Sequence, residues 1–337
     1  MRRRRTLLVG SVPLLAGLTS VALPGVAAAH DGISAESGAL GTVLSSWSFD
    51  APGIVLTLLF AAIYGWAFRR MRRDSPNFHF PIWHVRAFAL GIVLLLVTLV
   101  SPIDAYSDDL FWVHMVQHMI LVMLIAPLLL LGAPATLALR AASPRVRTTY
   151  LVPLLNSRPV RILTHPLIAL ILFVGSIWIW HIPTLYDAAI GSEPLHFVEH
   201  GAFLGGALLF WWLIVAVDAT RLRPSYVTRI AILIMAMIQN LGLALVITTD
   251  GDALYKTYER LAAVRHWGPD VLLDQQIGGG VMWVPGTMML AVAVLVTTYF
   301  WADHEGFRGR QMNLVRELEE RSADSGAERT TQGLRNA

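Results

Sequence analysis

The chain has 337 residues, of which 55% are hydrophobic and only 15% are charged, and its formal net charge is +3. Because soluble domains carry about 25% charged residues, this composition excludes an ordinary soluble protein and predicts an all-α, polytopic membrane helix bundle. The small net charge says little about nucleic acid, and we expect no nucleic-acid partner. The chain has no cysteine, which excludes disulfides, thiol redox chemistry and thiolate metal sites, so any metal must be held by imidazole, thioether, carboxylate or amide groups.

The first 29 residues have the three parts of a secretory signal peptide. Residues 2–5 are all arginine, an apolar run begins at Leu7, and residues 27–29 are all alanine. We therefore predict a signal peptide over residues 1–29, with an uncleaved first helix as the alternative, and an extracytoplasmic segment over residues 30–50. Cleavage would make His30 the N-terminus, where its amine and imidazole together could chelate copper.

Seven stretches that follow are apolar and long enough to be membrane-spanning helices. They make up a predicted membrane domain over residues 51–302. A charged tail over residues 303–337 is expected to start as a short helix and to end in disorder. The predicted spans are residues 52–68, 85–101, 111–131, 166–180, 195–217, 228–247 and 281–301.

Arginines are concentrated in alternate loops, namely those after the first, third, fifth and seventh spans. The loops over residues 102–110 and 182–194 contain no Lys or Arg, and the loop over residues 248–280 mixes three basic residues with several acids. Short loops rich in Lys and Arg remain in the cytoplasm. We therefore predict a plasma-membrane protein whose mature N-terminus is outside and whose C-terminus is cytoplasmic.

Two predicted spans begin with the same pattern of polar residues. The third contains HMVQH, with His114, Gln117 and His118, and the fifth contains HFVEH, with His196 and His200 in the same spacing. Residues four positions apart lie on one face of an α-helix. Polar side chains within a spanning helix normally face a protein interior, a cavity or a partner, so each pair is expected to face inward.

Further polar residues lie at the same predicted outer level. His181 ends the fourth span, Glu199 lies between the histidines of the fifth, and Asp274, Gln275 and Gln276 precede the seventh. Such clusters are rare in membranes, so we predict a shared metal or cofactor site rather than separate interfacial histidines.

Two methionines border this group of residues. Met115 and Met282 could each add a thioether to a soft ion, although packing is their simpler interpretation. Four other histidines are predicted near the cytoplasmic surface, where water or headgroups would satisfy them: His79, His84, His165 and His304.

Several chemistries fit this residue set. Copper suits imidazole ligands with an optional thioether, and Glu199 or Gln117 could orient an imidazole. A b-type haem could be held between histidine pairs on facing helices. The residues His196, Glu199 and His200 also match the H-x-x-E-H pattern of one group of zinc proteases. A transporter is less well supported, because no ionisable chain continues through the predicted membrane centre.

Four blocks of sequence together resemble the CtaG-type cytochrome c oxidase assembly factor family of bacteria. They are the run from WHVRAFALG through VHMVQHMIL to LLLLGAP, then THPLIALILFVGSIWIWHIPTLYDAA, LHFVEHGAFLGGALLFWW and DQQIGGGVMWVPG, and the resemblance covers about residues 47–301. It implies a seven-helix membrane protein, not an enzyme, that helps copper reach a haem–copper oxidase. The implied partners are oxidase subunits and membrane lipid, and a homo-oligomer stays open.

The resemblance also implies roles for individual residues. The histidine motifs of the family correspond to His114, His118, His181, His196 and His200, and its acidic-amide motif to Asp274, Gln275 and Gln276. We expect copper ligation by the first two and last two of these histidines, with His181 as a fifth candidate. The residues expected to orient the ligands or exchange with them are Glu199, Gln117, Asp274, Gln275, Gln276, Met115 and Met282.

Overall fold

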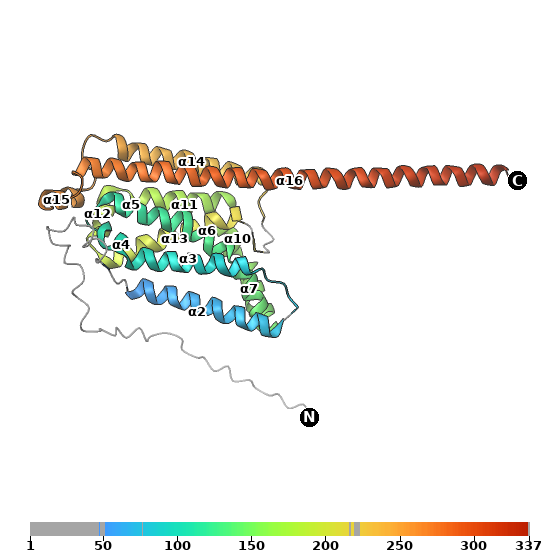
Figure 1. Ribbon diagram of the computed structural model, residues 1–337, viewed down its shortest axis with the longest axis horizontal. Helices are drawn as coiled ribbons and strands as arrows, with labels where there is room; N and C mark the ends of the chain where they lie inside the picture. The colour runs from blue at the N-terminus through green and yellow to red at the C-terminus, as the bar shows by residue number, and fades with distance from the viewer. Residues whose placement is uncertain (1–46, 48–50, 76, 216, 219–222, 336–337) are drawn as a thin grey trace, which may run out of the picture. The chain divides into compact units, whose positions relative to one another are not determined.

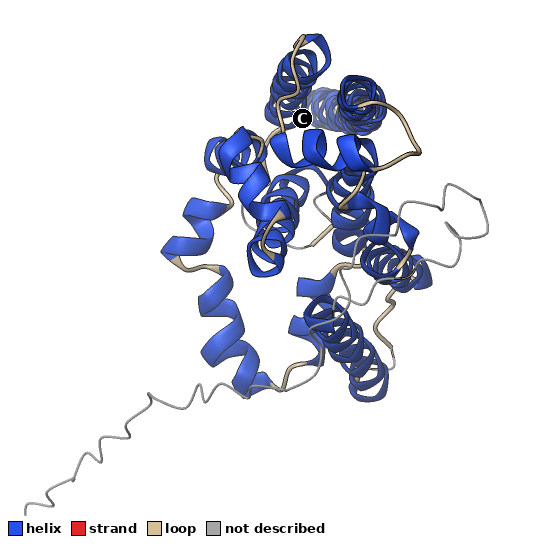
Figure 2. Cartoon of the chain, turned by 90° about the vertical axis from the view of Figure 1, so that its left-hand side faces the viewer, coloured by secondary structure: helices blue, strands red, loops and turns tan. Residues whose placement is uncertain are grey.

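The computed structural model of the protein describes residues 47, 51–75, 77–215, 217–218 and 223–335, with side chains up to residue 317. The predicted signal peptide and all of the segment at residues 30–50 except Trp47 lie outside these residues. Every regular element within the described part of the chain is a helix, which confirms the predicted all-α class (Figure 2).

Six helices or continuous helical runs are long and apolar enough to cross a bilayer, and a bent pair adds a seventh candidate. The structure thus agrees with the predicted multi-pass bundle. The six are α2 (Ala51–Asp74), α3 (Ile82–Val100), the run from α5 to α7 (Phe111–Ala141), α13 (Glu193–Val215), α14 (Tyr226–Thr249) and α16 (Val271–Arg335).

The bent pair consists of α11 (Pro166–Trp180) and α12 (Pro183–Ile190), whose axes differ by 76°. A 15-residue helix such as α11 is about 22 Å long, which is shorter than the roughly 30 Å hydrocarbon core. The bend follows from Pro183, because proline disfavours helical backbone at the residue before it, and Ile182 is extended with φ −64° and ψ 123°. His181 therefore lies at the break.

Short helices connect the spans at both ends of the bundle. Near the His181 end lie α4 (Pro102–Ser107) and α15 (Lys256–Val264). The connection between α7 and α11 is formed by α8 (Pro144–Val146), η2 (Arg147–Leu151), α9 (Val152–Leu155) and α10 (Arg158–Leu163).

The third span contains one wide turn, and a break at Gly132 and Ala133 precedes its last helix. It consists of α5 (Phe111–Met119), the π-helical segment η1 (Ile120–Ile125), α6 (Ala126–Leu131) and α7 (Pro134–Ala141). At the end of η1 the Ala126 N–H donates to the Leu121 carbonyl, five residues back. The Val122 carbonyl would need the N–H of residue 127, which is a proline and has none, and it accepts instead from Trp211 Nε1 at 2.9 Å.

The last helix begins earlier than the seventh predicted span and continues further. It starts at Val271 rather than Val281, because the Asp270 carboxylate accepts the Leu273 N–H at 2.9 Å and caps the first turn. It continues past the start of α14 to Arg335 (Figure 1), so residues 303–335 of the charged tail lie within α16.

The helix α16 packs closely along both α14 and α5 (Figure 1). Asn240 of α14 donates to the Met282 carbonyl at 2.9 Å. A Cβ at Gly278 would overlap the Phe111 ring of α5, and one at Gly279 would overlap the Thr248 hydroxyl of α14. The sequence GGG at residues 278–280 therefore allows the backbone of α16 to approach two neighbours.

Candidate metal centre

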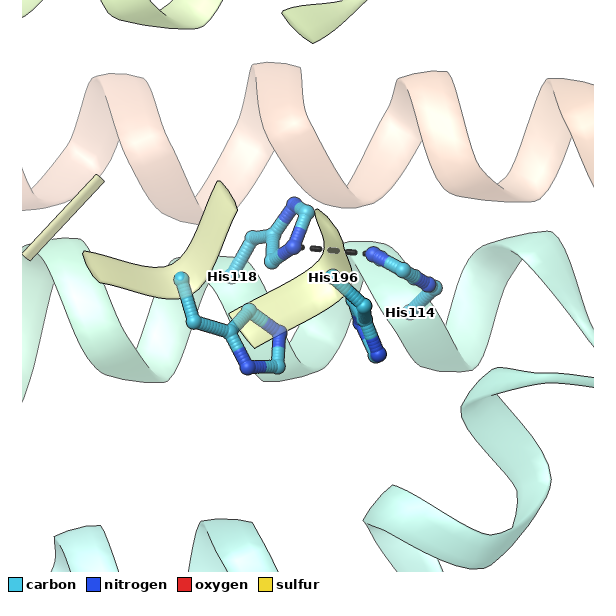
Figure 3. A group of neighbouring side chains, drawn as sticks. His114, His118 and His196 are labelled. Carbon is cyan, nitrogen blue, oxygen red and sulfur yellow. Dashed lines mark hydrogen bonds between the residues drawn. The ribbon is translucent and has the colours of Figure 1, made fainter. Parts of the chain in front are cut away.

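The two predicted histidine pairs meet in one cluster. His114 and His118 come from α5, and His196 and His200 come from α13. Each offers one ring nitrogen, and these four atoms lie within 4.8 Å of one another. Figure 3 labels three of the rings, with His196 beside the hydrogen-bonded pair His114 and His118.

The two imidazoles of α5 already have a separation that suits a shared ion. His114 Nε2 lies 2.8 Å from His118 Nε2. Two nitrogens that each bind an ion at about 2.0 Å and lie about 2.8 Å apart subtend an angle of about 90° at that ion. The remaining two rings lie within reach, since the ring centroids of His114 and His196 are 5.1 Å apart and those of His118 and His200 are 5.4 Å apart.

Tyr258 of α15 determines which nitrogen of His114 faces the cluster. Its hydroxyl donates to the Ser107 carbonyl at 2.7 Å and lies 3.2 Å from His114 Nδ1. Because that proton goes to Ser107, the hydroxyl oxygen accepts from the Nδ1–H of His114. The His114 Nε2 lone pair is then directed to the cluster. Sequence reasoning missed Tyr258, since a single tyrosine in an outer loop carries no pattern.

The four histidines differ in their access to the surroundings. His114 and His118 are buried, whereas His196 and His200 are partly exposed. His200 lines an apolar cavity of about 790 Å³, together with residues such as Leu99, Leu204 and Trp212. Among the described residues, His200 Nε2 and His118 Nδ1 have no hydrogen-bond partner. The cluster therefore has a buried side on α5 and a more open side on α13.

Glu199 provides a negative group next to the histidines. It is fully buried, and Oε1 lies 3.9 Å from His118 Nε2. Neither carboxylate oxygen has a hydrogen-bond partner within the described part of the chain. A buried carboxylate without partners is costly, and a cation held by the imidazoles would provide the missing countercharge.

His181 lies near the cluster but outside the group of four. Its Nδ1 donates to the Ile177 carbonyl at 2.7 Å, which leaves Nε2 as the acceptor nitrogen. Nε2 is buried and, among described atoms, has no hydrogen-bond partner. The ring lies 6.0 Å from Tyr186 and 6.1 Å from Phe203, measured between centroids.

Gln117 faces away from the imidazoles, toward α3 and α4. Its amide donates to the Thr98 carbonyl at 3.1 Å and to Asp104 Oδ1 at 2.6 Å. Gln117 therefore connects the histidine helix to the two helices that precede it.

Asp274 caps the histidine helix. Its carboxylate accepts the backbone N–H groups of Phe111 and Trp112 at 3.1 and 2.9 Å, and it pairs with Arg265 at 3.3 Å. Gln275 holds the outer loop, because it accepts the Leu254 N–H at 2.8 Å. The neighbouring Gln276 is exposed.

The two methionines lie in helix contacts. Met115 is fully buried and faces Gly278 of α16, where a Cβ would lie 3.3 Å from its Cγ. Met282 is buried in the large core, and its own backbone carbonyl accepts from Asn240. In this arrangement both side chains pack between helices.

Comparisons with known proteins identify relatives of this chain. The chain is 32% identical over 296 residues to the uncharacterized proteins Mb0105 of Mycobacterium bovis and MT0111 of Mycobacterium tuberculosis. These matches cover 85% of this chain but only 43% of each relative, so the chain spans less than half of their length. No solved structure matches the chain. Residues 62–304 match the cytochrome c oxidase caa3 assembly factor family, Caa3_CtaG. With all four clustered histidines inside the matched region, the chain belongs to this assembly factor family.

Proposed function

We propose that this protein binds copper at His114, His118, His196 and His200 and passes it to a haem–copper cytochrome c oxidase during assembly. Copper is the cargo in this proposal, and the protein performs no catalysis. The observation that carries the proposal is the convergence of four imidazoles from two spanning helices. Membership of an oxidase assembly factor family supplies the partner class.

The donor set suits copper better than a hard cation. Imidazole nitrogens bind Cu(I) and Cu(II), whereas Mg²⁺ and Ca²⁺ prefer oxygen ligands. Exchange with an acceptor requires ligands that can be reached from one side. The partly exposed His196 and His200 meet that requirement, while the buried pair on α5 would hold the ion.

A haem held between the pairs is less well supported. A porphyrin between any two of the four rings would have to displace the others, because all four donor atoms lie within 4.8 Å of one another. A zinc hydrolase is also less well supported. Catalytic zinc keeps an open position beside three protein ligands, and here a fourth histidine is close enough to fill it.

Metal titration of the purified protein tests the copper proposal. Cu(I) is titrated against a chromophoric chelator for the wild type and for His118→Ala and His200→Ala. Loss of a ligand should weaken binding by roughly 100-fold or more. The control is His79→Ala, an exposed histidine away from the cluster. Equal copper affinity in all four proteins would contradict the proposal.

A second measurement addresses delivery. Strains carrying His118→Ala or His200→Ala should insert the protein normally but show reduced oxidase activity and reduced copper in the purified oxidase. Full activity of the oxidase in these strains, with binding lost in the purified protein, would separate copper binding from any role in assembly.

A further inference from the structure

A basic hollow lies at the end of α11 opposite His181. It has a volume of about 800 Å³ and is lined by the α10 residues Arg158, Arg161 and Ile162, by the start of α11, and by Arg223 near the start of α14. His165 also lines it. Segments far apart in the sequence therefore bring three guanidinium groups to one concave surface.

The positive charge of this hollow is not neutralised within the described structure. The lining contains no carboxylate, and all three arginines are exposed. No ion pair involving them occurs among the described residues. The carboxylate of Asp218 accepts the backbone N–H groups of Ala135 and Thr136, and Arg223 donates to the Asp218 carbonyl, at 3.4 Å.

The start of α11 adds backbone donors to the same surface. Leu167 and Ile168 lie in its first turn and line the hollow. The residue before the helix, His165, makes no side-chain hydrogen bond that would cap this turn. Free N–H groups and the positive end of the helix dipole favour an anion at such a position.

The walls of the hollow are apolar and continue along the outside of the bundle. Ile162 and Leu167 are 58% and 57% exposed, and Ile171, one turn further along α11, is 54% exposed. A small inorganic anion would leave this surface uncovered. A molecule with an anionic head and an acyl chain would contact both the arginines and the apolar strip.

We propose that this hollow binds the phosphate headgroup of an anionic phospholipid of the bilayer, between Arg158, Arg161 and Arg223. The acyl chain lies along Leu167 and Ile171. Basic pockets between spanning helices at the membrane surface are suited to such headgroups. This site is separated from the histidine cluster by the length of α11, and the inference does not depend on copper binding.

Native mass spectrometry in a neutral detergent tests the site. The wild type is titrated with phosphatidylglycerol and, separately, with phosphatidylcholine, and the bound fraction gives the dissociation constant. The test variant is R158Q/R161Q. The matched control is R145Q/R147Q, which removes the same charge from the α8–η2 connection outside the hollow.

We expect the test variant to bind phosphatidylglycerol on the order of 30-fold more weakly, at about 1 kcal/mol for each basic residue. The control should bind as the wild type does, and phosphatidylcholine should bind weakly to all three proteins. Arg223→Gln alone should give a smaller loss of the same kind, which keeps the test available if the double variant does not fold.

Three results would overturn the proposal. Equal binding of phosphatidylglycerol and phosphatidylcholine would remove the charge selectivity. An equal loss of phosphatidylglycerol affinity in the test and control variants would show that binding depends on net charge and not on the hollow. If glycerol 3-phosphate or inorganic phosphate displaced all of the lipid at the same concentration, the ligand of the hollow would be a soluble anion and not a lipid. Copper binding, measured on the same variants, should be unchanged.

Discussion

At the scale of single residues, the cluster depends on groups that do not bind the ion themselves. Tyr258 is the clearest of these, because its hydroxyl contacts both Ser107 and His114 Nδ1. Burial raises the pKa of the Tyr258 phenol well above its usual value. The hydroxyl therefore stays protonated, and its effect on His114 should not depend on pH in the physiological range.

Tyr258→Phe should weaken copper binding by about 10- to 100-fold, the range found when a group that orients a metal-binding histidine is removed. The physical reason is that His114 becomes free to rotate and to change tautomer. Chelator competition on the purified variant measures the effect. The control is Tyr255→Phe, since the Tyr255 hydroxyl donates to the His181 carbonyl, at 3.4 Å, rather than to a histidine ring of the cluster. Equal affinity of the two variants would contradict this role of Tyr258.

At the scale of helices, three aspartates cap helices to which they do not belong. Asp274 caps α5, Asp218 caps α7, and Asp187 accepts the N–H groups of Lys256 and Thr257 at the start of α15 at 3.3 and 3.0 Å. Each cap satisfies backbone donors that the helix itself cannot satisfy. It also fixes a helix to a segment far away in the sequence.

Asp274→Ala and Asp218→Ala should each destabilise the protein by about 1–3 kcal/mol, because each leaves partly buried N–H groups without acceptors. Only Asp274→Ala should also weaken copper binding, since α5 carries candidate ligands and α7 carries none. Thermal unfolding in detergent and copper titration on both variants test this. Equal copper affinity in the two would show that the cap does not position the histidines.

The contact between α16 and α5 allows a second test on helices. Gly278→Ala places a methyl group against the Phe111 ring and should destabilise the protein by about 1–3 kcal/mol through overpacking. Gly280→Ala, two residues away, meets nothing within 4 Å and should be neutral or stabilising by up to about 1 kcal/mol. The unfolding temperatures of the two variants are compared with that of the wild type. An unchanged unfolding temperature for Gly278→Ala would mean that α16 and α5 can move apart at little cost in free energy.

At the scale of the whole molecule, the histidine cluster lies at one end of the bundle. The arginine-containing connection from α8 to α10 lies at the other end. Because the chain has no cysteine, single cysteines report membrane orientation without background. Ser192→Cys lies between α12 and α13, near the histidines, and Thr149→Cys lies in η2. We expect a membrane-impermeant maleimide to label Ser192→Cys in intact cells and Thr149→Cys only after permeabilisation. The reverse pattern would invert the predicted topology.

The sequence predicted that the two histidine pairs face each other, because the orientation of each pair depends on the local periodicity of its helix. Four-residue spacing places each pair on one helix face, and polarity turns that face inward. The surroundings of the pairs could not be predicted in the same way. Asp274 binds backbone atoms 163 and 162 residues away, and Tyr258 lies 144 residues from His114. Such contacts depend on packing between distant segments, and the periodicity of hydrophobic and polar residues does not predict them.

The wide turn at η1 has a consequence for the direction of the histidine pair. A π-helical turn is an α-helix with one additional residue, and one residue corresponds to about 100° of rotation about the helix axis. If Ile120–Ile125 wound as a regular α-helix without losing a residue, the azimuth of His114 and His118 would change by that angle relative to α6. The imidazoles would then no longer point at α13, although every one of them would still be present in the chain.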